Sequence, residues 1–229
     1  RELRCRFSLL KRSILGGMKV TKYAHACFMV ECDGKQLVVD PGGWTTDLGL
    51  PENVSAIVVT HEHADHFDIA TLQALAAHNP EAKIVAHPDI TKQLSETIPY
   101  HTVAPGETVT IGPFQLEFFG GQHATIHPTI PAIANLGVMI NNTLYYPGDS
   151  FALPQKPVDI LALPVAAPWL KVSEVIDFLG AVKPRVAFPT HDAILSDTGK
   201  SLLDRLLSPF ADKNGTLYQR IDSAPLELS

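Results

Sequence analysis

Hydrophobic residues along the chain fall into short runs that predict strands before they predict helices. Four such runs lie in the first sixty residues, at 19–24, 26–31, 35–40 and 55–60. Asp33-Gly34, between the second and third runs, is a turn signal typical of a hairpin. The run at 55–60, SAIVVT, is apolar at consecutive positions, which is typical of a strand buried on both faces.

Helical spacing begins after residue 67. Asp68 is a candidate N-cap for a helix whose apolar residues recur every three or four positions. Segment 83–87, KIVAH, predicts a further strand, and a helix is expected over 89–97. The chain therefore changes from strands alone to strands that alternate with helices.

The second half repeats this order. Strands are expected at 108–112, 114–120, 135–140 and 143–148, with Asn141-Asn142 as a hairpin turn. A strand–helix–strand unit follows at 158–165, 173–180 and 184–191, then an amphipathic helix around 202–207 and a closing strand at 215–221. Two β-rich halves, each followed by helices, predict an α+β fold in which two sheets form a sandwich with helices outside, as one domain over residues 18–229.

Composition is that of a soluble globular protein, with 45% hydrophobic and 18% charged residues among 229. No run approaches the roughly 18 apolar residues of a membrane span. The net charge of −6 disfavours a nucleic-acid partner. Three cysteines are too few for a disulfide framework and suit a reducing compartment, so a cytoplasmic location is expected. Residues 1–17 are basic and unlike the rest, and they are interpreted as an appendage to the fold.

Residue types that can bind metals are most concentrated directly after the strand at 55–60. His61-Glu62-His63-Ala64-Asp65-His66 fits the pattern H-x-H-x-D-H. If the segment stays extended, His61 and His63 point the same way and converge on one metal, and Asp65 and His66 turn toward a second. Imidazole nitrogens and carboxylate oxygens are both zinc ligands. The alternative is a strand end that is polar without binding anything.

Further polar residues stand where predicted strands end, which is how a rigid scaffold presents a site. These residues are Asp40, His87, His123, Asp149 and His191.

With these pieces in place, the chain resembles the metallo-β-lactamase-fold hydrolases over residues 18–229. The matching segments are THEHADH at 60–66, GQHATIHP at 121–128, YYPGDS at 145–150 and PTHD at 189–192. The resemblance implies a four-layer αββα sandwich of two mixed sheets, with a binuclear metal site at one edge.

The resemblance also implies a ligand set. One metal would be held by His61, His63 and His123, the other by Asp65, His66 and His191, with Asp149 bridging them. The ions would be two divalent cations, zinc first and manganese as the alternative. Asp65 would in addition orient the attacking hydroxide as a catalytic residue.

Segment 23–43 most resembles a subgroup that includes ascorbate-phosphate lactonase-like and N-acyl-phosphatidylethanolamine phospholipase D-like enzymes. The resemblance to this subgroup implies that His25 and Asp40 lie near the metals, with Asp40 orienting a ligand histidine. The alternatives are a buried, hydrogen-bonded His25 and a turn role for Asp40. His127 competes with His123 for the ligand position; otherwise it contacts substrate or is a loop histidine fixed by Pro128.

Two residues differ from the patterns of other branches of this family, and these differences reduce the number of functions to be expected. Asp149 stands where the β-lactamases with a cysteine ligand need cysteine, and His63 stands where the di-iron redox branch usually has an acid. The favoured hypothesis is a metal-dependent hydrolase that directs a metal-bridging hydroxide at an ester, lactone or phosphodiester of a small or medium anionic substrate. A metal-dependent redox enzyme and a noncatalytic metal-binding module are the alternatives. The expected partner is a small-molecule substrate, and homo-oligomer formation is left open.

Overall fold

The computed structural model describes residues 17–221 and 224–228, so the predicted appendage at 1–17 lies outside the described residues except for Gly17. Within the described part of the chain, the strands form two seven-stranded sheets. In spatial order the first sheet contains β14 (Leu226–Leu228), β1 (Met18–Lys22), β2 (Phe28–Cys32), β3 (Lys35–Val39), β4 (Val54–Val59), β5 (Lys83–Ala86) and β6 (Tyr100–Thr102). The second contains β13 (Leu217–Tyr218), β12 (Val186–Thr190), β11 (Ile160–Pro164), β10 (Leu144–Tyr146), β9 (Leu136–Ile140), β8 (Phe114–Gly120) and β7 (Thr108–Ile111).

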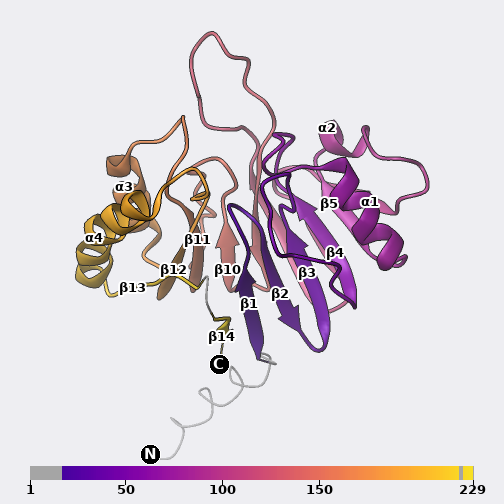
Figure 1. Cartoon of the computed structure of the whole chain (residues 1–229), viewed down its shortest axis with the longest axis horizontal. Helices are drawn as coiled ribbons and strands as arrows, with labels where there is room; N and C mark the ends of the chain where they lie inside the picture. Colours follow the sequence, from indigo (N-terminus) through magenta and orange to yellow (C-terminus); the bar gives the residue numbers. More distant parts are fainter. Residues whose placement is uncertain (1–16, 222–223, 229) are drawn as a thin grey trace, which may run out of the picture.

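Helices cover the outer faces of both sheets. They are α1 (Ile69–His78), α2 (Pro88–Thr91), α3 (Val172–Val182) and α4 (Asp197–Lys213). Helices α1 and α2 lie beside the first sheet, and α3 and α4 lie beside the second (Figure 1). Both sheets are mixed, because β3, β4, β5 and β6 pair in parallel in one, and β10, β11, β12 and β13 do so in the other. The predicted αββα sandwich is confirmed.

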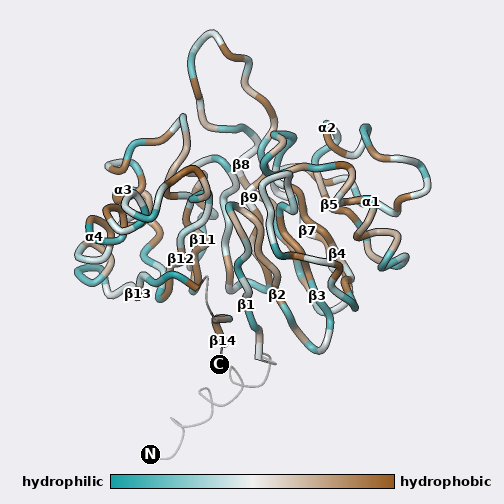
Figure 2. Tube along the Cα trace, viewed as in Figure 1, coloured by the Kyte–Doolittle hydropathy of each residue, from teal (hydrophilic) through white to brown (hydrophobic). Residues whose placement is uncertain are grey.

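The core has three apolar layers, which appear as brown stretches along the strands in Figure 2. Between the sheets, the ring of Phe28 packs edge-on against Tyr146 and Phe188, at centroid distances of 5.4 and 5.9 Å. Two outer layers join α1 to the first sheet and α3 and α4 to the second. Strands packed on both faces hold their ends in fixed positions. No helix among the described residues is both long enough and apolar enough to cross a membrane.

Local signals explain several element boundaries. The Asp68 side chain accepts a hydrogen bond from the backbone N–H of Thr71 at 2.8 Å, so the predicted cap of α1 is confirmed. Asn141 and Asn142 both have φ 51°, the left-handed conformation that asparagine tolerates, and they join β9 to β10 as the predicted hairpin.

Two predicted elements are shorter in the structure than expected. The helix expected over 89–97 ends at Thr91, because Ser95 Oγ accepts from the N–H of Thr97 in a local turn and Pro99 disfavours helix just before it. Strand β6 follows instead. The strand expected over 215–221 has only two residues, Leu217–Tyr218, and the chain then returns to the first sheet as β14, beside β1.

Polar residues collect at one edge of the sandwich. Strands β3, β4, β8, β10 and β12 all end there, in the upper part of Figure 1, and the long loop between β8 and β9 rises above it. The segments that follow these five strands contain Asp40, the histidine motif, His123, Asp149 and His191.

Candidate metal centre

The histidine motif forms a tight turn directly after β4. The backbone N–H groups of His66 and Phe67 both donate to the carbonyl of His63, at 2.9 Å each. The expected turn at Asp65 and His66 is thus present, and the rings of His61 and His63 lie together, with centroids 4.8 Å apart. The turn places His63, Asp65 and His66 close to His61, which directly follows β4.

The segment after β3 supports this turn from beneath. Gly43 N–H donates to the Ala64 carbonyl at 2.7 Å. A Cβ atom on Gly42 would lie 2.1 Å from the carbonyl carbon and oxygen of Asp65, so only glycine fits there. The Pro-Gly-Gly sequence at 41–43 is thus a packing requirement of the site, and sequence analysis did not identify it as such.

Four buried histidines share one arrangement: Nδ1 bonds to a protein oxygen and Nε2 has no hydrogen-bond partner. His123 Nδ1 donates to the Ala124 carbonyl at 2.6 Å, and His191 Nδ1 donates to the Ala166 carbonyl at 2.5 Å. The Nε2 atoms without partners belong to His61, His66, His123 and His191. Each of these Nε2 atoms thus lies buried without a hydrogen-bond partner, in the orientation that a metal-ligating imidazole has when the protein holds its Nδ1.

Asp40 organises the other two rings. Its buried carboxylate accepts from the N–H and the hydroxyl of Thr60, at 2.8 and 2.7 Å, and from His66 Nδ1 at 2.7 Å. The hydroxyl proton of Thr60 points to Asp40, so His61 Nδ1 donates to the Thr60 oxygen, at 3.0 Å. Asp40 also has φ 46°, so one residue both turns the chain after β3 and orients His66.

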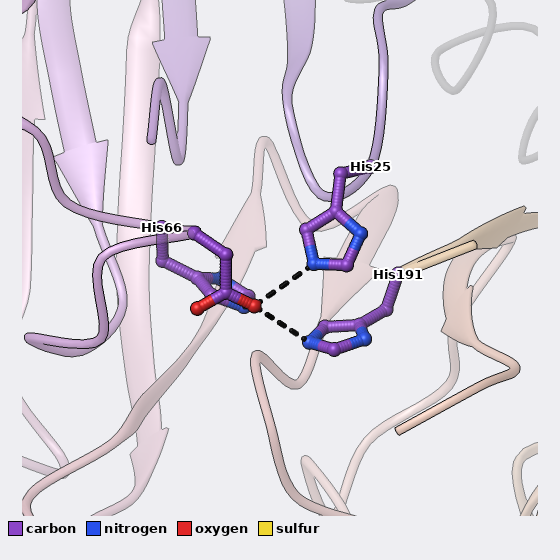
Figure 3. A group of neighbouring side chains, drawn as sticks. His25, His66 and His191 are labelled. Carbon is purple, nitrogen blue, oxygen red and sulfur yellow. Dashed lines mark hydrogen bonds and ion pairs between the residues drawn. The ribbon is translucent and has the colours of Figure 1, made fainter. Parts of the chain in front are cut away.

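The predicted ligands collect in two main groups, and a third set, His61, His66 and Asp149, connects them. His61, His63 and His123 have ligand atoms within 4.8 Å of one another. The second group adds His25 to the three residues predicted for the other metal, Asp65, His66 and His191. The carboxylate of Asp65 is 2.9 Å from His25 Nε2 and 3.3 Å from His191 Nε2. Figure 3 shows His25, His66 and His191 lying close to one another.

Asp149 lies between the two groups. Its Oδ1 is 3.3 Å from His66 Nε2, and its Oδ2 is 3.0 Å from His191 Nε2 and 3.5 Å from His123 Nε2. One carboxylate thus reaches histidines of both groups, which is the geometry expected of the predicted bridging residue. The Asn135 side chain fixes its backbone by accepting from the Asp149 N–H at 2.9 Å.

Charges inside the cluster favour a cation. Burial, together with the neighbouring His66, holds the pKa of His61 well below its usual value. Burial opposes a charge on His191 as well, but its contacts with Asp149 and Asp65 raise its pKa to about 9. Burial raises the pKa of Asp149, yet the surrounding histidines outweigh it and keep that pKa well below the ordinary range. Two ionised carboxylates among imidazoles attract either protons or metal ions.

Two candidate histidines lie outside these groups. His127 Nδ1 accepts from the Thr129 N–H at 3.2 Å, and the ring is on the loop between β8 and β9. His87 Nδ1 accepts from the Asp89 N–H at 3.2 Å and caps α2. A helix cap therefore explains why a histidine follows β5.

Trp169 also lies at the site. Its indole Nε1 donates to Asp149 Oδ2 at 2.8 Å. The ring also packs against Phe151, with centroids 5.1 Å apart. The apolar segment around Trp169 gave no signal that the indole would reach a carboxylate.

Comparisons with known proteins identify the family. The family model described as "Beta-lactamase superfamily domain" matches residues 19–191. The chain belongs to this superfamily. Protein Rv0786c of Mycobacterium tuberculosis is 36% identical over 190 residues, which cover 81% of this chain and 89% of that protein. UPF0173 metal-dependent hydrolase MJ1163 of Methanocaldococcus jannaschii is 27% identical over 187 residues, covering 75% of this chain and 83% of that protein.

Solved structures agree on the fold. Igni18, a metallo hydrolase from the hyperthermophilic archaeon Ignicoccus hospitalis, superposes with a TM-score of 0.71 at 15% identity, covering 93% of this chain and 99% of that chain. The metallo-beta-lactamase fold protein YhfI from Bacillus subtilis gives 0.67 at 18% identity, covering 93% of this chain and all of that chain (100%). The resemblance seen in the sequence is confirmed at the level of the superfamily.

Proposed function

We propose that this member of the superfamily is a metal-dependent hydrolase that holds two divalent ions at the edge where β4, β8, β10 and β12 end. The observation that carries the proposal is the convergence of four buried, unpartnered histidine Nε2 atoms on the carboxylate of Asp149, whose Oδ1 has no hydrogen-bond partner either. Buried polar atoms without partners are costly, and a ligated cation removes that cost. Relatives described as metal-dependent hydrolases support the same conclusion.

In this proposal His61, His63 and His123 hold one ion, while Asp65, His66 and His191 hold the other, with Asp149 between them. A donor set of imidazoles and carboxylates suits zinc, with manganese as the alternative. When bound, two such ions supply a hydroxide at neutral pH and polarise the substrate oxygen. The substrate is a small molecule with an ester, lactone or phosphodiester bond.

Asp65 orients the attacking water. Burial acts to raise the pKa of the Asp65 carboxyl. Hydrogen bonds with His191 and His25 lower this pKa by more than burial raises it, so it lies well below the usual range. The carboxylate is therefore ionised and accepts hydrogen bonds at neutral pH. His25 keeps Oδ2 in place at 2.9 Å and has φ 60°, a conformation that costs energy outside glycine and that places the ring against Asp65.

The test is metal content together with turnover. Full-length protein reconstituted with zinc or manganese is expected to retain two ions per chain after desalting and to hydrolyse 4-nitrophenyl esters, lactones or bis(4-nitrophenyl) phosphate. His61→Ala and Asp149→Ala should each lose metal and reduce kcat by at least about a hundredfold. His101→Ala, an exposed histidine on β6, is the matched control and should change neither quantity. Undiminished turnover in either site variant contradicts the binuclear proposal.

A further inference from the structure

A cavity of about 430 Å³ opens beside the metal centre, and we call it the loop pocket. His63 and His123 form its inner wall, and residues 124–128 and 130–133 of the loop between β8 and β9 form the rest. This volume lies within the range of small-molecule sites, about 300–1,000 Å³. A group that occupies the loop pocket would therefore lie directly against two residues of the proposed metal site.

The lining of the loop pocket combines apolar side chains with Thr125 and three histidines, His63, His123 and His127. Ile126, Ile130 and Ile133 project from the loop, together with two prolines and two alanines. No Asp, Glu, Lys or Arg is among the lining residues, all of which belong to the described part of the chain. The side chain of Ile130 is 48% exposed, so the loop presents hydrophobic surface to solvent beside the site.

The loop is held in place at its base. His123 N–H donates to the Ile133 carbonyl at 3.0 Å, and Ala124 N–H donates to the Asp149 carbonyl at 2.8 Å. Neighbouring antiparallel strands such as β8 and β9 need only two to five residues to connect, and longer structureless loops usually serve a function. Figure 2 shows brown, hydrophobic stretches on this loop above the sandwich. The extra length thus builds a wall over the metal centre.

The cavity on the other side of the centre differs in chemistry. It measures about 410 Å³, lies against His25, and is lined by Lys22, Asp47, Asp192 and Lys200 among others. The two sides of the centre therefore select different parts of a substrate. Charged side chains line the second cavity but not the loop pocket, so an uncharged aliphatic group can be buried in the loop pocket without desolvating lysine or aspartate side chains.

We propose that the loop pocket binds an uncharged aliphatic group attached to the carbonyl carbon of a carboxylic ester or lactone. The proposal rests on the proposed hydrolase function and names the substrate class of that site. It replaces the expectation of an anionic substrate with that of an uncharged group at this wall, because no lysine or arginine lines it. A compact phosphodiester would leave the isoleucines without a partner, whereas an acyl chain covers them.

The first test uses 4-nitrophenyl acetate, butyrate, hexanoate and octanoate with the metal-loaded protein. We expect kcat/KM to rise about two- to fourfold per methylene until the pocket is filled. The double variant Ile126→Ser/Ile130→Ser should flatten this dependence on chain length. Leu202→Ser, which changes an exposed leucine on α4, is the control and should keep the dependence of the wild type.

The second test does not depend on turnover. Isothermal titration of the metal-loaded protein with hexanoate and with acetate should show at least about tenfold tighter binding of hexanoate, falling below about threefold in the double variant. Equal binding of hexanoate and acetate would contradict the proposal that the loop pocket binds an aliphatic group, even if esters are hydrolysed. If hexanoate binds tightly and no ester or lactone is turned over, the loop pocket stands as a binding site and the proposed hydrolysis fails. Circular dichroism and the thermal midpoint confirm that the variants are folded.

Discussion

The indole Nε1 of Trp169 donates a 2.8 Å hydrogen bond to Oδ2 of Asp149. The Oδ1 atom of the same carboxylate is buried and has no hydrogen-bond partner, at 3.3 Å from His66 Nε2. One oxygen is thus fixed by the protein and the other is left for a cation. Trp169 therefore sets the direction in which Asp149 faces the two histidine groups.

Trp169→Phe tests this relationship, because it removes the N–H and retains an aromatic ring against Phe151. We expect metal affinity to fall about 10- to 100-fold, as is usual when a partner of a ligand is removed. Competition with a chromophoric chelator measures the change. Trp44→Phe is the control: Trp44 packs on the ring of His25 at 4.8 Å, and a phenyl ring retains that contact. Equal affinities of Trp169→Phe and the wild type would show that the hydrogen bond does not position Asp149.

A second prediction concerns Asp40, which accepts hydrogen bonds from both Thr60 and His66. Asp40→Asn keeps the size of the side chain but replaces one acceptor oxygen with a donor. The His66 ring then loses its charged partner, and we expect a 10- to 100-fold loss of metal affinity and about 1–3 kcal/mol of unfolding free energy. Urea unfolding and metal titration measure the two effects. Asp33→Asn, in the exposed turn between β2 and β3, should change neither.

The sequence predicted the layers of the fold because strand periodicity is local. The apolar residues of runs such as 55–60 and 114–120 are enough to identify each run as a buried strand, and β8 has the predicted bounds, Phe114–Gly120. Strands β6 and β14 could not be predicted in this way. All three residues of β6 are exposed, and β14 is defined only by its pairing with β1 across the whole length of the chain.

The candidate site likewise has residues that the sequence could predict and contacts that it could not. His61 to His66 are adjacent in sequence, so their motif was readable without a structure, and the resemblance supplied His123, Asp149 and His191. Contacts between distant segments were not readable, because the sequence does not indicate which backbones meet. The close approach of Gly42 to Asp65 and the bond from Trp169 to Asp149 are both of this kind.

Gly42→Ala tests the first of these contacts. The added Cβ would lie 2.1 Å from the Asp65 carbonyl, which is backbone and cannot move aside without displacing the turn. We expect a loss of about 3 kcal/mol or more in unfolding free energy, together with loss of metal from the second group. Gly180→Ala, inside α3, meets only the Asn214 side chain at 3.9 Å and should instead stabilise by about 0.5–1 kcal/mol. Equal effects of the two substitutions would contradict the packing argument.

The last prediction concerns the buried charges behind His191. Asp192 is 3.1 Å from Lys22 Nζ, and the two side chains are each only 2% exposed. Arg220 bonds to the other carboxylate oxygen. Removing one partner of a buried ion pair leaves the remaining charge poorly solvated, so Asp192→Asn should lower the unfolding free energy by about 3 kcal/mol.

The exposed pair of Asp159 and Arg185 provides the matched control. It has a comparable hydrogen-bonded geometry, at 2.9 Å, but side chains 42% and 59% exposed, so Asp159→Asn should cost less than about 1 kcal/mol. Chemical unfolding in the presence of a chelator separates this stability effect from metal binding, because neither carboxylate belongs to the ligand groups. A cost for Asp192→Asn no larger than that for Asp159→Asn would mean that burial adds nothing to the pair. The segment that carries His191 would then depend on its backbone contact with His25, a 3.0 Å hydrogen bond, rather than on the charges behind it.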